Sequence, residues 1–198
     1  MVALGGNVSI HCQTQSEQRV EFYLTKEVTS RNTPAVKVSD PHEVIFPIVS
    51  ATKSDGGKYW CLYHFKENYN NWSPPSDTVY INLTDPTLSK PSLKMIPTRE
   101  SALGLNVTIQ CQGSEKGLTF ALQKESKQIA FQTTEADRDT AEFPFFMLKS
   151  EDAQGYTCQY HHRSNPFVWS EPSEPVELVL RGKTLDSKYI TSYLLLKC

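Results

Sequence analysis

The chain has 198 residues, with 20 Lys and Arg against 22 Asp and Glu and a net charge of -2. This charge balance gives no concentrated basic surface, which argues against nucleic acid or an anionic membrane as a partner. The length suffices for two domains of about 100 residues each. Short alternating segments separated by turn residues dominate the chain and no helical period is present, which indicates an all-β protein.

A cysteine pattern occurs twice along the chain. Each copy reads Asn-Val-Ser/Thr-Ile-x-Cys and ends on Tyr-x-Cys, so that the cysteine pairs are Cys12 with Cys61 and Cys111 with Cys158. One pair per copy, with a tyrosine shortly before the second cysteine, is the signature of two immunoglobulin-like sandwiches in tandem. A disulfide that closes about 50 residues stabilises a domain by about 4 kcal/mol in the chain-entropy model. Such bonds persist in oxidising compartments, so we expect an extracellular chain.

In each copy, the strand that leads to the first cysteine also carries a glycosylation sequon, and its alternation shows which way the asparagine side chain points. Val8, Ile10 and Cys12 alternate on the inward face of a strand, so Asn7 points outward, and Asn106 does the same in the second copy. Asn-x-Ser/Thr sequons agree with an extracellular location. We predict glycosylation at Asn7, Asn71, Asn82 and Asn106.

Aromatic and serine motifs recur at matching places further along each copy. Phe22 and Phe120 occupy the position where antibody domains place a tryptophan against the disulfide. Tyr59 and Tyr156 are predicted corner residues whose hydroxyls hydrogen-bond to the backbone. Each copy closes on Trp-Ser-x-x-Ser, which we interpret as a structural motif; its members are Trp72, Ser73 and Ser76, and Trp169, Ser170 and Ser173.

The repeat divides the chain into three segments. We predict immunoglobulin-like domain 1 at residues 1-84, immunoglobulin-like domain 2 at 85-182 and a disordered tail at 183-198 that matches nothing in domain 1. Two prolines in the link, Pro86 and Pro91, predict a stiff elbow. Domain 1 has little sequence ahead of Gly5, so we expect its first strand to be missing.

The two ends of the chain carry separate expectations. Neither a secretory signal nor an apolar run long enough to span a bilayer is visible, so we interpret the chain as a fragment or a secreted variant. Cys198 lies outside the two-disulfide framework, and we expect that it can link two chains.

Three motifs that recur in order point to one family: Phe-x-Leu-x-Lys-Glu after the first cysteine, a later Phe-Pro, and Trp-Ser-x-x-Ser. Over roughly residues 2 to 182 the chain resembles the leukocyte receptor complex group. This group includes leukocyte and killer-cell immunoglobulin-like receptors, the IgA Fc receptor, platelet glycoprotein VI and the osteoclast-associated receptor. The resemblance implies two C2-type sandwiches at a bent elbow, display outside the cell, and a protein ligand such as MHC class I, antibody Fc or collagen. It also implies a signalling adaptor or a cytoplasmic tail in a full-length receptor, neither of which this chain contains.

Ligand binding in such folds takes place on loops at the ends of the sandwich or at the elbow. In domain 1 we select Phe65 and Tyr69 from a loop rich in aromatic residues and asparagine, and in domain 2 we select Arg163 and Phe167. The alternative in both domains is a solvated hairpin that touches no ligand. The adjacent His161 and His162 point to opposite faces of a strand and are poorly placed to bind one metal ion.

Enzymatic motifs such as Gly-x-Ser-x-Gly and His-Glu-x-x-His do not occur, so we expect no enzyme and no cofactor. We interpret the chain as the extracellular ligand-binding portion of a leukocyte receptor, held at the plasma membrane in a full-length form. One alternative is a soluble plasma protein of the alpha-1B-glycoprotein type, which binds or inhibits a target. A purely adhesive role is a third interpretation.

Overall fold

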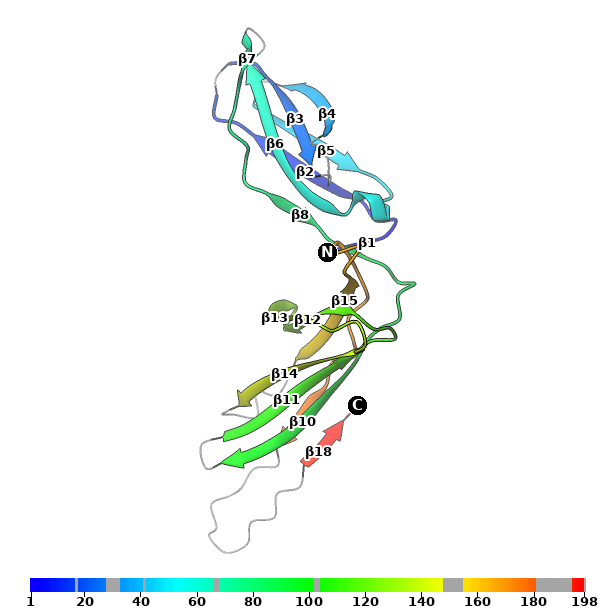
Figure 1. The fold of residues 1–198 in the computed structure, drawn as a ribbon. Coiled ribbons are helices and arrows are strands. Elements are labelled where there is room, and N and C mark those ends of the chain that lie inside the picture. The colour runs from blue at the N-terminus through cyan, green and yellow to red at the C-terminus, as the bar shows by residue number, and fades with distance from the viewer. Residues whose placement is uncertain are drawn as a thin grey trace, which may run out of the picture. The chain divides into compact units, whose positions relative to one another are not determined.

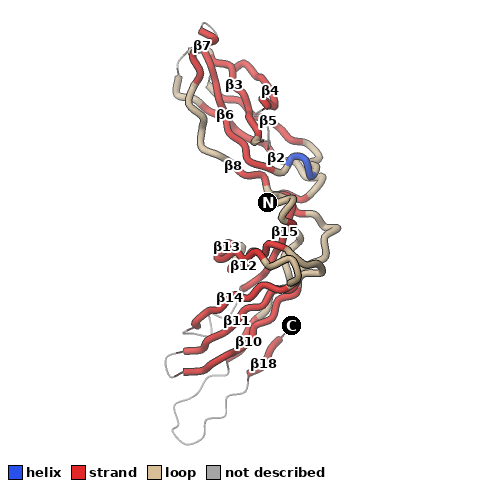
Figure 2. Tube along the Cα trace, viewed as in Figure 1, coloured by secondary structure: helices blue, strands red, loops and turns tan. Residues whose placement is uncertain are grey.

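The computed structural model describes residues 1-16, 18-27, 33-40, 42-65, 68-101, 104-147, 155-180 and 194-197. Within these ranges the regular structure is strand, apart from the short helix η1 (Lys53–Asp55) drawn blue in Figure 2. The prediction of an all-β protein is therefore confirmed. The chain divides into unit 1 (Met1–Asp85) and unit 2 (Pro86–Cys198), one residue from the predicted domain boundary.

Unit 1 packs two sheets against each other (Figure 1). One sheet pairs β2 with β5, and the other has the order β4-β3-β6-β7 with β8 paired to β6. A short strand, β1, pairs in parallel with β9, and the expected loss of the first strand of domain 1 stays a prediction. The strands are β1 (Val2–Ala3), β2 (Val8–Gln13), β3 (Val20–Lys26), β4 (Thr33–Asp40), β5 (Glu43–Ile48), β6 (Gly57–Phe65), β7 (Asn68–Trp72), β8 (Val79–Ile81) and β9 (Leu83–Thr84).

Unit 2 repeats this arrangement. One sheet has the order β10-β11-β14, and the other contains β16-β15-β12-β13. Pro144 lies on β14, at the edge of its sheet, where a residue without an N–H is tolerated. The strands are β10 (Ser92–Ser101), β11 (Gly104–Gln112), β12 (Leu118–Lys124), β13 (Lys127–Thr133), β14 (Thr140–Met147), β15 (Tyr156–His162), β16 (Val168–Trp169), β17 (Glu177–Leu180) and β18 (Leu194–Lys197).

A disulfide joins the two sheets of each unit. Cys12 on β2 is bonded to Cys61 on β6, and Cys111 on β11 is bonded to Cys158 on β15. The phenylalanines expected beside these bonds are buried, and each packs against a tyrosine of the neighbouring strand. The ring centroids are 6.0 Å apart for Phe22 and Tyr63 and 5.9 Å apart for Phe120 and Tyr160. Alternate residues of the strands complete the core of unit 2; the most buried include Met95, Ile109, Leu118, Leu122 and Ala141.

The serines of the Trp-Ser-x-x-Ser motifs make the hydrogen bonds that a neighbouring strand would otherwise make. In unit 2, the Ser170 N–H donates to the Tyr160 carbonyl at 2.8 Å, and the Tyr160 N–H donates to Ser170 Oγ at 3.1 Å. In unit 1, Ser73 makes the same two bonds with Tyr63. A hydroxyl thus satisfies an N–H of β6 or β15 that would otherwise face the motif without a partner. The motif continues the sheet where the chain has left the strand conformation.

Part of the segment expected to be disordered forms a strand. β18 pairs antiparallel with β17, with Leu196 opposite Leu178. Among the described residues β17 has no other partner strand, so its edge can accept an apolar segment. The segment 183-198 thus contains the four residues of β18, and the disorder expected for this tail stays a prediction. Residues 181-193 and Cys198 lie outside the described part of the chain.

Candidate functional site

The alternation of strand residues gives unit 1 an outward face that is rich in aromatic side chains. On β6, Cys61 and Tyr63 face the core, so Trp60 and Leu62 point away from it. Tyr23 of β3 lies opposite Leu62 on this outward face. Together with residues of β7 and β8 they form a set that we call the aromatic face: Tyr23, Trp60, Leu62, Trp72 and Tyr80.

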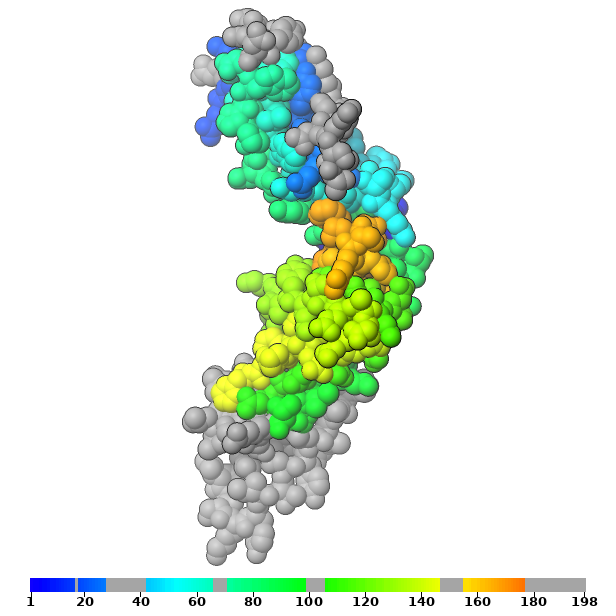
Figure 3. All heavy atoms as spheres, in the orientation of Figure 1, coloured from blue at the N-terminus to red at the C-terminus, as the bar shows by residue number. Residues whose placement is uncertain are grey.

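The aromatic face is continuous because its members come from neighbouring, hydrogen-bonded strands. Trp72 lies opposite His64, and Tyr80 opposite Lys58. Figures 1 and 3 show the green β8 at the surface of unit 1, next to β6. Trp72 is 48% exposed and Tyr80 is 61% exposed. Tyrosine and tryptophan supply a large contact area at little cost in side-chain entropy, so this face is suited to bury against a protein.

A buried polar cluster supports the aromatic face from below. The Tyr23 hydroxyl lies 3.1 Å from His64 Nε2 and donates to Glu21 Oε2 at 3.3 Å, and His64 Nε2 lies 3.2 Å from the same carboxylate oxygen. Glu21 and His64 are both buried. The Trp72 ring packs on Tyr23 and His64, with both centroid distances 4.9 Å. The cluster therefore fixes the orientation of Tyr23 and Trp72.

A charged residue borders the other end of the aromatic face. Lys58 Nζ lies 6.0 Å from the centroid of the Trp60 ring, within the range of a cation–π contact, and 3.7 Å from Glu27 Oε1. Lys58 is also the residue opposite Tyr80. An aromatic centre with charged groups at its margin is the usual layout of a protein-binding surface.

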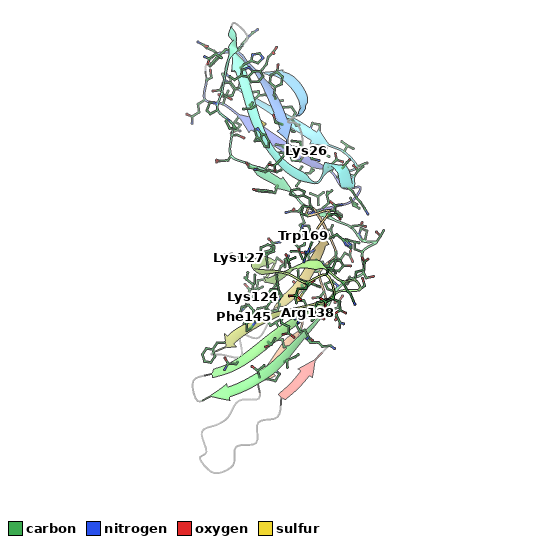
Figure 4. The ribbon with its side chains drawn as sticks, in the orientation of Figure 1. Lys26, Lys124, Lys127, Arg138, Phe145 and Trp169 are labelled. Atoms are coloured by element: carbon green, nitrogen blue, oxygen red, sulfur yellow. A yellow bond between two sulfur atoms is a disulfide. The ribbon has the colours of Figure 1, made fainter. Side chains whose placement is uncertain are left out.

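The corresponding face of unit 2 is different. Smaller or polar residues, Ala121, Thr157 and Gln159, stand on its strands β12 and β15. Its tryptophan, Trp169, is only 4% exposed and is labelled in Figure 4. The most exposed apolar side chain of β13 is Phe131, at 59%, and its ring centroid lies 6.4 Å from that of Trp169. Unit 2 therefore offers a smaller apolar patch than unit 1.

A buried histidine lies beneath that tryptophan. The His161 ring packs edge-on against Trp169 at 4.5 Å, and its Nδ1 lies 2.8 Å from the His162 carbonyl oxygen. Burial lowers the pKa of His161 from its usual value of 6.5. The neutral imidazole is thus the form that unit 2 holds at neutral pH.

The ligand-contact residues expected in unit 1 lie in the hairpin formed by β6 and β7. Phe65 is half-buried at the end of β6, on the same side of the strand as Tyr63, and the two rings pack edge to face at 5.8 Å. Tyr69 lies on β7, and its side chain is outside the described part of the structure. Phe65 therefore contributes to packing, whereas Trp72 is exposed among the side chains of this hairpin that the structure describes.

The residues expected to bind ligand in unit 2 flank one turn between β15 and β16. Arg163 is exposed, and its Nη2 donates to the carbonyl of Thr134, so the guanidinium is tied to its own unit. Phe167 is half-buried just ahead of β16. Phe65 and Tyr69 belong to unit 1, whereas Arg163 and Phe167 belong to unit 2. The four residues therefore do not form one site within a unit. Their roles as ligand contacts stay predictions.

The corner tyrosine of unit 1 has the expected backbone partner. Tyr59 is buried, and its hydroxyl donates to the Asp55 carbonyl at 2.8 Å. Tyr156 is equally buried: its ring centroid lies 5.2 Å from Lys124 Nζ and 5.9 Å from the centroid of the Phe145 ring, and both of these neighbours are labelled in Figure 4. Asp152, the counterpart of Asp55, lies outside the described residues.

The four predicted glycosylation sites have different surroundings. Asn7 and Asn71 are exposed, whereas Asn82 and Asn106 are half-buried. The Asn7 side chain is engaged by the protein, because its Oδ1 accepts the Ser50 N–H at 3.0 Å. Glycan attachment at these positions stays a prediction.

Sequence patterns alone did not point to Tyr23, Trp60, Leu62 or Tyr80, and they assigned Trp72 a structural role. A usable signal was present in the alternation around Cys61. An inward cysteine places its neighbours Trp60 and Leu62 on the outward face, where two large apolar side chains in succession are unusual. The pairing of β6 with β8 that adds Tyr80 joins residues far apart in the chain, and only the fold shows it.

Two classes of site are absent from the residues that the structure describes. No cluster of three or more histidine, cysteine, aspartate or glutamate side chains there could hold a metal ion. No helix in those ranges has the length and apolar character needed to cross a membrane.

Residues 97-171 match the family model of the immunoglobulin domain. The match covers much of unit 2, including both cysteines of its disulfide. This match and the two disulfide-bonded sandwiches identify the fold as immunoglobulin-like.

Comparison with curated proteins identifies relatives among receptors. The chain is 32% identical to human Immunoglobulin superfamily member 1 over 182 residues, which cover 88% of this chain and 12% of that protein. It is 31% identical to human Leukocyte immunoglobulin-like receptor subfamily B member 4 over 193 residues, or 95% and 42% of the two chains. It is 29% identical to mouse Platelet glycoprotein VI over 182 residues, or 92% and 54%. The chain therefore spans between 12% and 54% of these relatives.

Among solved structures, the human OSCAR ligand-binding domain matches with a TM-score of 0.45 and 27% identity over 88% of this chain and 90% of that one. The resemblance to the leukocyte receptor group that the motifs indicate is confirmed by the curated relatives. The chain is thus similar to receptor-type immunoglobulin-like proteins of that group, which are non-enzymatic binding proteins.

Proposed function

We propose that the chain is the extracellular ligand-binding part of a leukocyte-type receptor and that it binds a protein ligand through the aromatic face of unit 1. The observation that carries this proposal is the continuous outward set of Tyr23, Trp60, Leu62, Trp72 and Tyr80. Exposed apolar patches of this kind on soluble domains mark interaction sites. Tyrosine and tryptophan are also the residues that most often dominate binding energy at interfaces.

The ligand classes to examine are MHC class I, antibody Fc and collagen. They are the classes implied by the resemblance to the leukocyte receptor group, and the homology to leukocyte receptors supports them as candidates. The two disulfides support an extracellular location, because reducing compartments do not maintain such bonds. Signalling through an adaptor or a cytoplasmic tail of a longer receptor is part of the proposal.

The test is direct binding of the full chain to immobilised MHC class I, Fc and collagen by surface plasmon resonance. We expect one of the three to bind and Trp60→Ala and Tyr80→Ala each to weaken binding at least about tenfold, as loss of an aromatic anchor does. The matched control is Ile45→Ala. Ile45 is 58% exposed on β5, in the other sheet of unit 1, and its change should leave the affinity unaltered.

Melting curves of each variant exclude general unfolding as the cause of lost binding. Absence of binding to all three ligands would count against the receptor proposal. Binding that is unaffected by both aromatic variants would place the site elsewhere, and Arg163→Ala and Phe167→Ala would then examine the turn of unit 2.

The proposed Cys198-linked dimer concerns a residue outside the described part of the chain. Electrophoresis without reducing agent should show a dimer that Cys198→Ser abolishes. A monomer alone in both proteins would contradict the link.

A further inference from the structure

We infer that the glycan on Asn106 packs its first N-acetylglucosamine against the ring of Phe146, so that the sugar becomes part of the outward face of the β10-β11-β14 sheet. Asn106 lies opposite Phe146 in the pairing of β11 with β14. Directly opposed residues on one face of an antiparallel pair have Cβ atoms about 5 Å apart. The inference rests on the extracellular location in the proposed function.

The exposure of Phe146 is the observation that calls for a partner. Phe146 is 52% exposed in the second-last pair of the β11–β14 ladder, whereas the preceding residue, Phe145, packs on Tyr156. Phe146 lines a groove of about 470 Å³ together with Thr98, Asn106, Thr108 and Pro144. Figure 3 shows β14, in yellow, at the surface of unit 2.

The groove contains its own attachment point. Asn106-Val107-Thr108 is a sequon, and the residues at its first and third positions both line the groove. The Thr98 hydroxyl donates to the Asn106 carbonyl at 3.1 Å, which fixes the backbone at the attachment point. A β-linked N-acetylglucosamine carries C–H bonds on one face of its ring and hydroxyls at its edge. Its apolar face can therefore cover the Phe146 ring while the hydroxyls remain in water.

The equivalent position in unit 1 lacks the aromatic ring, and the side chain of its asparagine is held by a backbone N–H. Val49 stands where unit 2 has Phe146, and the Asn7 side chain is already hydrogen-bonded to the Ser50 N–H at 3.0 Å. No sugar platform is expected there, although Asn7 is also in a sequon. The comparison provides a matched substitution, Phe146→Val, which gives unit 2 the residue of unit 1.

The experiment uses the full chain secreted from a glycosylating mammalian cell line. Glycopeptide mass spectrometry should find Asn106 occupied. NMR of protein trimmed to a single N-acetylglucosamine should show upfield-shifted ring protons for the Asn106 sugar. Phe146→Val should abolish that shift, whereas the sugars at the other sequons should keep their chemical shifts.

Stability supplies a second readout that does not depend on the spectra. Asn106→Gln and Phe146→Val should each lower the Tm by roughly 4 °C in glycosylated protein, and the double variant should fall no further. The same four proteins made without glycans should show no coupling between the two positions. An unoccupied Asn106, an unshifted sugar, or equal coupling with and without glycan would overturn the inference. None of these results depends on ligand binding, so a failure here is distinguishable from a failure of the proposed function.

Discussion

Ser173 and Cys158 exchange two hydrogen bonds across unit 2. The Ser173 N–H donates to the Cys158 carbonyl at 2.8 Å, and the Cys158 N–H donates to Ser173 Oγ at 3.0 Å. The serine side chain thus completes a pairing to a cysteine of the core disulfide. The repeated serines are needed for this backbone arrangement, because no alanine could accept the second bond.

Replacing Ser173 with alanine should reduce the free energy of unfolding by about 1–2 kcal/mol, since the buried Cys158 N–H loses its acceptor. Urea denaturation measures the change. Ser164→Ala, at an exposed turn position of the same unit, is the control and should cost less than about 0.5 kcal/mol. Equal effects of the two changes would contradict the role of the hydroxyl.

Removing His64 should destabilise unit 1 by roughly 3 kcal/mol, because the buried Glu21 carboxylate then loses the polar partner that lies 3.2 Å away. Changing Glu21 to glutamine in the same protein should restore part of the loss. Chemical denaturation of wild type, His64→Ala, Glu21→Gln and the double variant measures this coupling. Additive effects would show that the two side chains stabilise unit 1 independently.

Stability should fall in mild acid because of His161. Burial lowers the pKa of His161 below 6.5, so below that pH the unfolded chain binds a proton that the folded chain takes up only at lower pH. The contribution is complete above pH 6.5 and is lost as the pH falls toward the folded-state pKa, by at most about 1.4 kcal/mol per pH unit. His161→Phe should reduce this slope in denaturation curves recorded between pH 7 and 5. The neighbouring His162→Gln is the control and should retain it.

Tyr59 should ionise later than an ordinary tyrosine. Burial, with a smaller contribution from the Asp55 charge, raises the pKa of Tyr59 to about 12. Because the unfolded chain loses this proton near pH 10, the stabilisation by Tyr59 is complete below that pH and is lost as the pH rises toward 12. Ultraviolet titration should show a late phenolate step that Tyr59→Phe removes. Persistence of the step in that variant would assign it to another tyrosine.

Much of the architecture could be predicted because it is encoded in short-range patterns. Alternation identified the strand around Cys12, and the spacing of the cysteines predicted the pairs Cys12–Cys61 and Cys111–Cys158 that the structure contains. The order of motifs such as Trp-Ser-x-x-Ser was sufficient to indicate the receptor group. Each of these signals depends on residues within one strand or on a covalent partner, so the chain displays it without being folded.

The aromatic face and the groove at Asn106 exist only in the tertiary structure. Tyr23, Trp60 and Tyr80 become one surface only because β3, β6 and β8 are paired, and the register of β11 with β14 sets Phe146 opposite Asn106. A shift of one residue in either pairing would turn these side chains to the other face of the sheet. The sequence by itself determined two disulfide-bonded immunoglobulin-like units, and the long-range register determined which side chains each unit presents to a partner.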